Sequence, residues 1–442
     1  MIEIKPFKGI LYNEKKVGDI EKVVTPPYDV IDEVGQRQFS EMSEYNSVRL
    51  ILSQKLPGDD DRENKYERAA RTFKKWRDKG VLLQDEEESI YLYEEEFKDT
   101  KGEIRHRRGF IALLKLEEFG KGNIFPHEET MSKPKEDRLK LTRACNANFS
   151  QVFGLYSTSS PADVQELFEN TLKEEPRISV TDQDGVVHRL WSISSREIIT
   201  ELQEEMSKGK IYIADGHHRY ETALNYRNER RKATGDFTGN APFDYVMMMF
   251  VSLDDPGLVV FPFHRVVKEF PLEKLEALEE SLSPYFSVKK YQYPSGKESE
   301  GCTQLLQEME QLGRSSHAFG AYIGDGTYYL FTLKADDDES ISKLVEGNMS
   351  LEQKSLDVTI LHSVIFKKLL NVNQDDDNIE YLRDEHKIIP MVDSGDYKVA
   401  FFLNPTKVDD VSGIAEKGGK MPKKSTYFYP KLYTGLVFRS IE

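Results

Sequence analysis

Apolar positions recur along the chain at two different periods, so the sequence predicts both helices and strands. In residues 65–80 apolar side chains recur every three or four positions and the pattern stops at Gly80, which predicts a helix. Residues 195–207 carry a similar stripe behind Ser195, a residue type that caps helices. A further helix is expected from about Tyr220 onward, after the short apolar strand "IYIA".

Runs of period two between turn residues predict paired strands. Residues 90–93 and 110–116 flank the polar segment "KDTKGE" and are expected to form a hairpin. The two halves of "ISVTDQDGVVHRLWSIS" form another about an Asp-Gly turn, and a third is expected at residues 324–327. The segment "DYVMMMFVSLDDPGLVVFPFHRVV" predicts two strands joined by a turn. Helices and strands that alternate irregularly favour an α/β fold with α+β mixed sheets.

The chain of 442 residues exceeds the size of one hydrophobic core, so two or three domains are expected. A helix near residues 272–282 starts a second group of elements, which includes a long helix over residues 356–370. The sequence therefore predicts a boundary near Phe270. Residues 1–270 would form one region, and residues 271–438 a C-terminal α+β domain whose tail returns to the functional site.

Charge and cysteine content limit the partners and the compartment. The formal net charge of −16, without a basic stripe, disfavours a nucleic-acid-binding protein. Acidic runs at residues 59–61, 86–88, 336–339 and 375–377 are expected to be solvated loops. The longest apolar run is too short for a membrane helix, the N-terminus lacks the apolar core of a secretory signal, and two distant cysteines suit free thiols. These features predict a cytoplasmic protein that binds neither nucleic acid nor membrane; they leave its oligomeric state open.

The segment "YIADGHHRYETAL" places Asp215, Gly216, His217, His218 and Arg219 between a strand and a helix. The first N–H groups of a helix lack internal partners, and the helix dipole favours an anion there. Gly216 would let a phosphate approach the backbone, and the two histidines and Arg219 would add donors. Asp215 would hold a bridging Mg²⁺ or receive a proton from an attacking hydroxyl. The turn is thus expected to hold nucleotide phosphates; the structural alternative has Asp215 as a cap, one histidine packed inward and Arg219 in a surface salt bridge.

Other segments offer the groups that such a site would still need. The block "PHEETMSKPKEDRLKL" supplies Glu128 and Glu129 as candidate bases and Arg138 as a cation for an anionic substrate. The tail block "MPKKSTYFYPK" supplies Lys424 and Ser425 as phosphate contacts. "TPPYDV" forms a stiff turn that presents a tyrosine and an aspartate. Each block also fits an ordinary loop without a catalytic role.

The turn "IADGHHRYETAL" resembles the signature of the ParB/sulfiredoxin superfamily, in which a strand leads into an Asp-Gly-x-x-Arg turn and a helix. Its histidine-containing form is nearest to that of the free-serine kinases of the superfamily. The chain also resembles the family catalogued as domain of unknown function 1015 (DUF1015) over nearly its whole length. The blocks that carry this resemblance are "TPPYDVI", "PHEETMSKPKEDRLKLTRACNANFSQVFGLY", the turn itself, "FPFHRVV" and "MPKKSTYFYPKLYTGLVF". The resemblance implies a ParB/sulfiredoxin-like core, and the link to the kinases passes through the turn alone.

These residues favour a small-molecule kinase that transfers phosphate from ATP or ADP, with Mg²⁺, to a hydroxyl group. The resemblance makes free L-serine, converted to O-phosphoserine, the best single acceptor. The expected catalytic residues are Asp215, Glu128, Glu129 and His218. The expected nucleotide-binding residues are Gly216, His217, His218, Arg219, Arg138, Lys424 and Ser425, with Asp215 as the metal ligand.

Other functions remain open at this point. A ParB-like regulator would bind and slowly hydrolyse CTP or ATP without a small acceptor, and a scaffold protein with a vestigial turn would bind no nucleotide. A metallohydrolase is disfavoured because the adjacent His217 and His218 diverge on any regular backbone. A sulfiredoxin-like reductase is disfavoured because the turn carries no cysteine.

Overall fold

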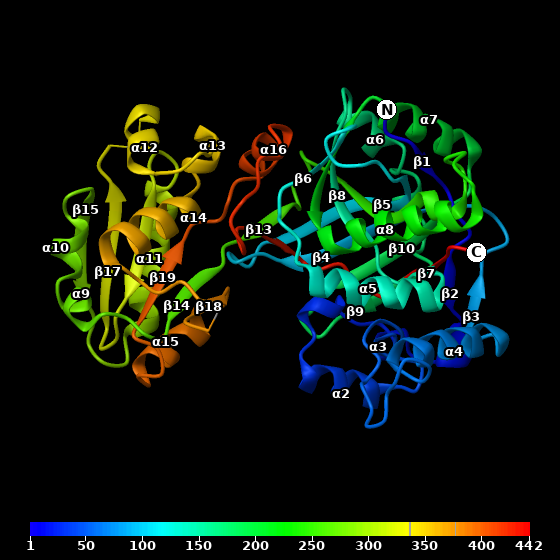
Figure 1. Ribbon diagram of the computed structural model, residues 1–442, viewed down its shortest axis with the longest axis horizontal. Helices are drawn as coiled ribbons and strands as arrows, with labels where there is room; N and C mark the ends of the chain where they lie inside the picture. Colours follow the sequence, from blue (N-terminus) through cyan, green and yellow to red (C-terminus); the bar gives the residue numbers. More distant parts are fainter. Residues whose placement is uncertain (336, 376) are drawn as a thin grey trace. The chain divides into compact units, whose positions relative to one another are not determined.

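The computed structural model describes residues 1–335, 337–375 and 377–442; Asp336 and Asp376, members of two acidic runs, lie outside the described residues. The chain divides into two compact units (Figure 1). Unit 1 comprises residues 1–259 and 430–442, and unit 2 comprises residues 260–429. Unit 2 is therefore inserted into the chain of unit 1, whereas the sequence placed a boundary near Phe270 and assigned the tail to the second domain.

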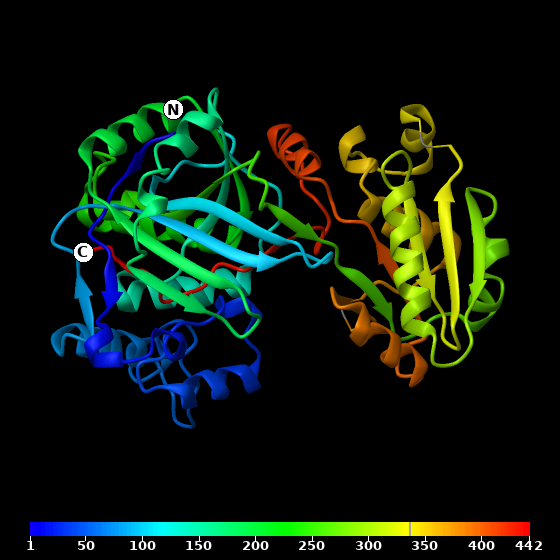
Figure 2. The same cartoon turned by 180° about the vertical axis from the view of Figure 1, so that it is seen from behind.

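Unit 1 is built on a mixed sheet with strand order β6–β11–β8–β12–β5–β4–β10–β9, and β1 pairs with β5. β11 runs parallel to β6 and antiparallel to β8, which runs parallel to β12. Figure 2 shows the long antiparallel β4–β5 pair. The strands of this sheet are β1 (Ile4–Lys5), β4 (Ile90–Lys98), β5 (Ile104–Lys115), β6 (Ile124–Pro126), β8 (Val152–Ser157), β9 (Ile178–Thr181), β10 (Val187–Ile193), β11 (Lys210–Asp215) and β12 (Tyr245–Ser252). The expected α/β fold with mixed sheets is confirmed.

The two faces of the unit 1 sheet are covered differently. Alternate strand residues such as Phe110 and Met248 face a core shared with α6, α7 and α8, because successive side chains of a strand point to opposite faces. The opposite face carries Arg107 and Phe153 and meets the C-terminal tail. The helices of unit 1 are α1 (Glu14–Val17), α2 (Glu33–Met42), α3 (Val48–Ile51), α4 (Lys65–Asp78), α5 (Ser132–Cys145), α6 (Pro161–Glu166), α7 (Arg196–Ser207) and α8 (His217–Thr234). Its short strands β2 (Ile10–Tyr12) and β3 (Leu82–Gln84) pair with each other, as do β7 (Ala147–Asn148) and β21 (Arg439–Ser440).

Unit 2 holds an antiparallel sheet with strand order β15–β17–β16–β19–β14–β18. Its strands are β14 (His264–Val267), β15 (Phe286–Gln292), β16 (Ala318–Tyr322), β17 (Thr327–Leu333), β18 (Ile379–Leu382) and β19 (Val399–Leu403), and β13 (Val259–Phe261) pairs separately with β20 (Tyr427–Tyr429). Two apolar clusters, one including Phe331 and one including Leu305, pack helices against the sheet. These helices and the remaining ones are α9 (Leu272–Glu276), α10 (Leu278–Leu282), α11 (Glu298–Leu312), α12 (Asp338–Leu344), α13 (Leu351–Lys354), α14 (Asp357–Ile360), the π-helix Leu361–Leu370, α15 (Glu385–Asp393) and α16 (Val408–Glu416).

Two predicted elements are interrupted in the structure. The helix expected over residues 272–282 is interrupted at Ala277, and the strand expected through residues 259–267 divides into β13 and β14 around Pro262. Proline lacks the N–H group that a central strand position needs, which explains the second break. None of the described helices has the length and apolar character needed to span a bilayer.

Candidate functional site

Asp215 ends β11 at a position where the ladder to β8 is irregular. Ile211 and Ile213 pair with Tyr156 and Gly154, but Asp215 pairs with Phe153, so the register shifts after Ile213. Strict alternation would point Asp215 into the core with the two isoleucines. The bulge instead brings it beside Phe153, on the opposite face of the sheet, which is how bulges re-aim side chains.

Gly216 turns the chain from β11 into α8. Its φ of 84° lies in the left-handed region, and a Cβ atom there would lie only 2.8–2.9 Å from the guanidinium of Arg219. The helix begins at His217, three residues earlier than the sequence predicted, so the histidines and Arg219 form its first turn. Gly216, the residue before the helix, has no side chain that could cap the first N–H groups of α8. The start of a helix favours an anion, because its first N–H groups lack partners within the helix.

The carboxylate of Asp215 lies between two cations. Its Oδ2 accepts from Nη2 of Arg219 at 2.6 Å, and its Oδ1 lies 2.8 Å from Nζ of Lys431. Arg219 also donates through Nη1 to the carbonyl of Gln151. Burial would raise the pKa of Asp215, but Lys431 and Arg219 together hold it well below its usual range. Asp215 is therefore ionised, and its single negative charge offsets only part of the positive charge of Arg219 and Lys431.

His217 connects α8 to Glu128 in the loop of residues 127–131. Its Nε2 accepts from the backbone N–H of His127 at 3.2 Å, which places the ring proton on Nδ1. Nδ1 lies 3.4 Å from Oε2 of Glu128, and His217 is buried while the Glu128 side chain is 35% exposed. Glu129 is exposed. Of the two candidate bases, Glu128 is the one that faces an orienting ring.

His218 holds the other end of the 127–131 loop. Its Nε2 accepts from the backbone N–H of Met131 at 3.0 Å, and burial lowers the pKa of the ring, so it is neutral. Thr130 is fixed as well, because it donates to Glu221 of α8 at 2.7 Å. The sequence offered both histidines as phosphate donors. In the structure their Nε2 atoms accept loop N–H groups instead, which leaves the Nδ1–H of each ring as its donor.

Arg138 of α5 is buried against the turn that contains Tyr28. Its guanidinium carbon lies 4.0 Å from the centroid of the Tyr28 ring, a cation–π contact. It donates to the carbonyl of Ile51 at 2.7 Å and to the carboxylate of Asp137. Burial raises the pKa of Tyr28 to about 12. The "TPPYD" turn, the "PHEET" block and the Asp215 turn, far apart in sequence, therefore meet in unit 1.

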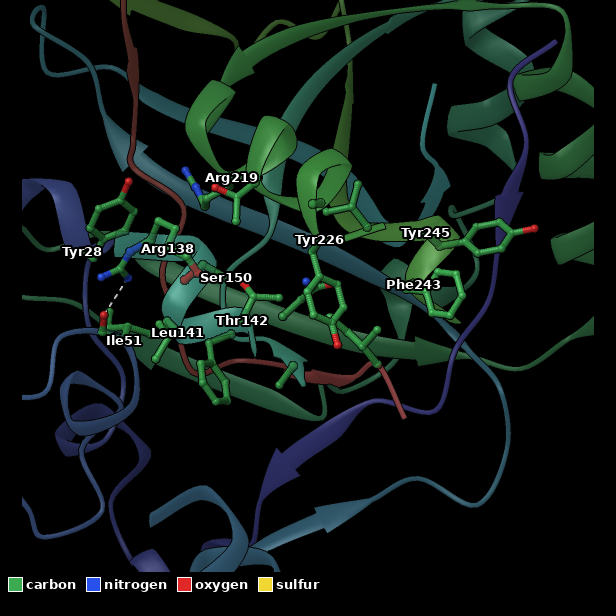
Figure 3. Close-up of a pocket in the computed structure, with 17 residues that line it drawn as sticks. Tyr28, Ile51, Arg138, Leu141, Thr142, Ser150, Arg219, Tyr226, Phe243 and Tyr245 are labelled. Carbon is green, nitrogen blue, oxygen red and sulfur yellow. Dashed lines mark hydrogen bonds between the residues drawn. The ribbon is translucent and has the colours of Figure 1, made fainter. Parts of the chain in front are cut away.

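A cavity of about 60 Å³ lies between α5 and α8 (Figure 3). Arg138, Arg219 and Tyr28 lie toward one end of it, and Phe243 and Tyr245 toward the other. The lining between these ends mixes polar side chains, Thr142, Asn148, Ser150 and Thr222 among them, with apolar ones such as Leu141, Phe149 and Val246. A water needs roughly 10–15 Å³ by this measure, so the cavity has room for a few waters or a metabolite of similar size. A whole nucleotide would not fit in it.

Lys424 and Ser425 belong to unit 2. Lys424 has a left-handed backbone with φ 56°, and its Nζ lies 5.1 Å from the centroid of the Phe263 ring. Ser425 is buried and donates through Oγ to the carbonyl of Pro422 at 2.6 Å. Their participation in the site remains a prediction. In the described part of the chain, no group of three or more histidine, cysteine, aspartate and glutamate side chains is arranged to hold a metal ion.

Sequence reasoning missed Lys431, the second cation on Asp215. It stands in the same tail block as Lys424, directly after Pro430. The block contains several lysines, and only the tertiary structure shows that Lys431 is in the part that belongs to unit 1. In the sequence, Lys431 differs from the other lysines of the block by its position between a proline and an apolar segment.

A family model described as "Protein of unknown function (DUF1015)" matches residues 4–359. No curated protein matches the chain significantly. Among solved structures, a free serine kinase in complex with AMP is 13% identical, with a TM-score of 0.29 and coverage of 70% of this chain and 85% of that one. A conserved hypothetical protein from Pyrococcus furiosus is 12% identical, with a TM-score of 0.29 and coverage of 69% and 87%. SbnI from Staphylococcus aureus, truncated at its C-terminus, is 10% identical, with a TM-score of 0.33 and coverage of 73% and 85%. Similarity this low supports no inference about activity.

Proposed function

The chain belongs to the DUF1015 family, and from that premise we propose that it is a small-molecule kinase that transfers phosphate from ATP or ADP to a hydroxyl acceptor. The observation that carries the proposal is the Asp215 carboxylate, held between Lys431 and Arg219 beside the start of α8, which follows a glycine. The carboxylate of Asp215 already binds these two cations. A nucleotide phosphate can take the place of the carboxylate on Lys431 and Arg219.

The chain's own groups match the requirements of phosphoryl transfer, which are mainly positioning and charge neutralisation. N–H groups at the start of α8 would bind phosphate oxygens, and Gly216 would allow their close approach. Arg219 and Lys431 would neutralise the charge that develops on the transferred group. Asp215 suits Mg²⁺, which proteins bind through one or two carboxylates together with substrate phosphates. When bound, Mg²⁺ would supply further neutralisation of the phosphate charge.

Glu128 is the proposed general base. Its carboxylate faces Nδ1 of His217 at 3.4 Å and is partly exposed, so a hydroxyl group can reach it. The hydrogen bond from the His127 N–H fixes the His217 ring, which in turn orients the carboxylate. His218 is proposed to anchor the loop that carries this base.

The small acceptor is proposed to bind in the cavity between α5 and α8. Its cationic end suits a carboxylate, since Arg219 has more N–H groups than it donates to Asp215 and Gln151. The size, the cationic end and the hydroxyl and amide groups in the lining fit a small hydroxylated amino acid. L-Serine, giving O-phosphoserine, is the acceptor we propose to test first.

The test is incubation of the protein with Mg²⁺, each nucleotide and pooled amino acids, followed by mass spectrometry of the products. A phosphorylated amino acid is expected with the unaltered chain. Asp215→Asn is expected to keep nucleotide binding, since both cations and the helix end remain, and to lower turnover about a hundredfold. The matched control is Asp184→Asn, at an exposed aspartate in the turn between β9 and β10.

Two outcomes would redirect the proposal. Nucleotide binding or hydrolysis without a phosphorylated product would instead favour a ParB-like regulator. No nucleotide binding by calorimetry would overturn both readings and leave the turn a structural feature.

A further inference from the structure

A buried polar cluster lies on the sheet face that meets the C-terminal tail, and we call Tyr93, Glu95, Arg107 and His188 the tail-holding cluster. Arg107 is fully buried, and its Nε donates to Oε2 of Glu95 on the neighbouring strand at 2.6 Å. The hydroxyl of Tyr93 lies 3.3 Å from Oε1 of Glu95 and 2.7 Å from Nδ1 of His188. These residues are adjacent on β4, β5 and β10, so one sheet face positions all of them.

The cluster contacts the tail on both sides of Lys431. Nη2 of Arg107 donates to the carbonyl of Pro430, the preceding residue, at 2.6 Å. The ring of His188 stacks on the ring of Tyr433, with centroids 4.6 Å apart and planes inclined by 29°. Arg107 also lies 4.8 Å from the centroid of Phe153, the ladder partner of Asp215. The contacts therefore fix the backbone on either side of the lysine that binds Asp215.

Residues 430–433 belong to no helix or strand, so ladder hydrogen bonds do not define their course. A lysine side chain has many rotamers, and its ammonium reaches one carboxylate oxygen reproducibly only when its backbone is fixed. Burying an arginine–glutamate pair costs desolvation free energy, and a pair of apolar residues at the same positions would often be as stable. An apolar residue could not, however, donate a hydrogen bond to the Pro430 carbonyl.

We propose that Arg107 and His188 are positioning residues that place Lys431 against Asp215, and so set the affinity of the site for the phosphates of a nucleotide. This inference rests on the proposed function for its ligand. Its structural part, the fixing of the tail, can be measured without any ligand. Arg107 donates to the residue directly before Lys431, so its effect on binding is expected to pass through that lysine.

The experiment uses the full-length chain with Arg107→Met, Arg107→Lys and Lys431→Met, alone and combined. Arg107→Lys keeps a cation opposite Glu95 but lacks the fork that reaches both Glu95 and Pro430, so it covers the case in which Arg107→Met does not fold. Hydrogen exchange of residues 431–436 is expected to quicken about tenfold in both Arg107 variants. Arg105→Met, on the same strand with a partly exposed side chain, is the matched control and should leave that exchange unchanged.

Nucleotide affinity then separates positioning from a general loss of stability. Lys431→Met and Arg107→Met are each expected to weaken ADP binding about tenfold, because each removes the same charge-assisted contact. The combined variant should bind as Lys431→Met does, since Arg107 acts through Lys431. Additive losses, or unchanged exchange of the tail in both Arg107 variants, would overturn the inference. If the unaltered chain binds no nucleotide, the proposed function fails, while the exchange result still decides whether Arg107 holds the tail.

Discussion

At Gly216 two separate constraints exclude a side chain: the left-handed backbone and the adjacent guanidinium of Arg219. Gly216→Ala is expected to reduce the free energy of unfolding by about 1–2 kcal/mol from the backbone conformation alone. A further loss should follow, because the added methyl group displaces Arg219 from Asp215. Urea denaturation of the two proteins measures the total.

Gly185 offers the matched control for that variant. Its φ of 79° is nearly the same, but a Cβ atom there would meet nothing within 4 Å. Gly185→Ala should therefore show the backbone cost without the displacement. Equal losses at the two positions would mean that the Arg219 contact adds nothing to stability.

His218 predicts a specific pH dependence for the attachment of the 127–131 loop. Burial lowers the pKa of its ring in the folded protein, while Glu221 and Asp29 oppose the shift. Below the ordinary histidine value of about 6.5 the unfolded chain therefore binds the proton more readily than the folded one. The stability that neutral His218 contributes is present above that pH and is lost as the pH falls through it toward the folded-state value.

The measurement is urea denaturation at pH 7.5 and pH 5.5 for the unaltered chain and for His218→Gln. Glutamine keeps an acceptor for the Met131 N–H and does not titrate. The unaltered chain should lose more stability than the variant between the two pH values. A parallel loss in both proteins would show that His218 does not contribute to the acid sensitivity.

Single residues show where sequence reasoning succeeded and where it stopped. The residue types of the turn predicted an anion site, because the start of a helix, a glycine and cations converge there by local chain geometry alone. The partners of those residues depend on tertiary structure. That His217 faces Glu128, and that Lys431 completes the cation pair on Asp215, follows from contacts across about 90 and 216 residues of chain.

Among the elements, α8 and β11 carry the functional geometry. Sequence periodicity found both, together with α4, α7 and the hairpins β4–β5 and β9–β10. It missed the bulge after Ile213, because a register shift is a property of the pair of strands and not of one of them. The predicted start of α8, near Tyr220, lies too late in the chain, because the polar first turn of the helix has no apolar pattern.

The start of α8 should respond to nucleotide where the start of α7 does not. At α7 the hydroxyl of Ser195 accepts from the Ile198 N–H, whereas α8 begins at a glycine without a side-chain cap. Saturating ADP is expected to slow hydrogen exchange at residues 217–220 about tenfold and to leave residues 196–199 unchanged. Protection of both helix ends would indicate a general stabilisation instead of an anion at α8.

At the scale of the molecule, length alone predicted more than one domain, but not an inserted one. A boundary near Phe270 followed from the change of elements along the chain. The sequence predicted that the tail of the second domain returns to the site. That residues 430–442 belong to unit 1 has no local pattern, because it depends on pairings such as those of Ile10 with Phe438 and Thr25 with Thr434.

Removal of unit 2 tests which groups the site requires. Replacing residues 262–426 by a short Gly-Ser linker keeps β13 and β20, which pair with each other, and all of the unit 1 contacts described above. Nucleotide affinity is expected to stay within about threefold of that of the full chain. Turnover then tests Lys424 and Ser425. If turnover is retained, neither residue belongs to the site. If turnover is lost, Lys424→Ala in the full chain should lower it as well.

The insertion of unit 2 also has a consequence for how the protein is made. Domains generally fold as they leave the ribosome, and unit 2 is a continuous stretch that is complete when residue 429 has been synthesised. Unit 1 must wait for the residues that follow, Lys431 among them. During translation Asp215 is therefore without its second cation until after the whole of unit 2 has emerged. We expect a nascent chain to gain the proposed phosphate-binding site only after residues 430–442 have been synthesised.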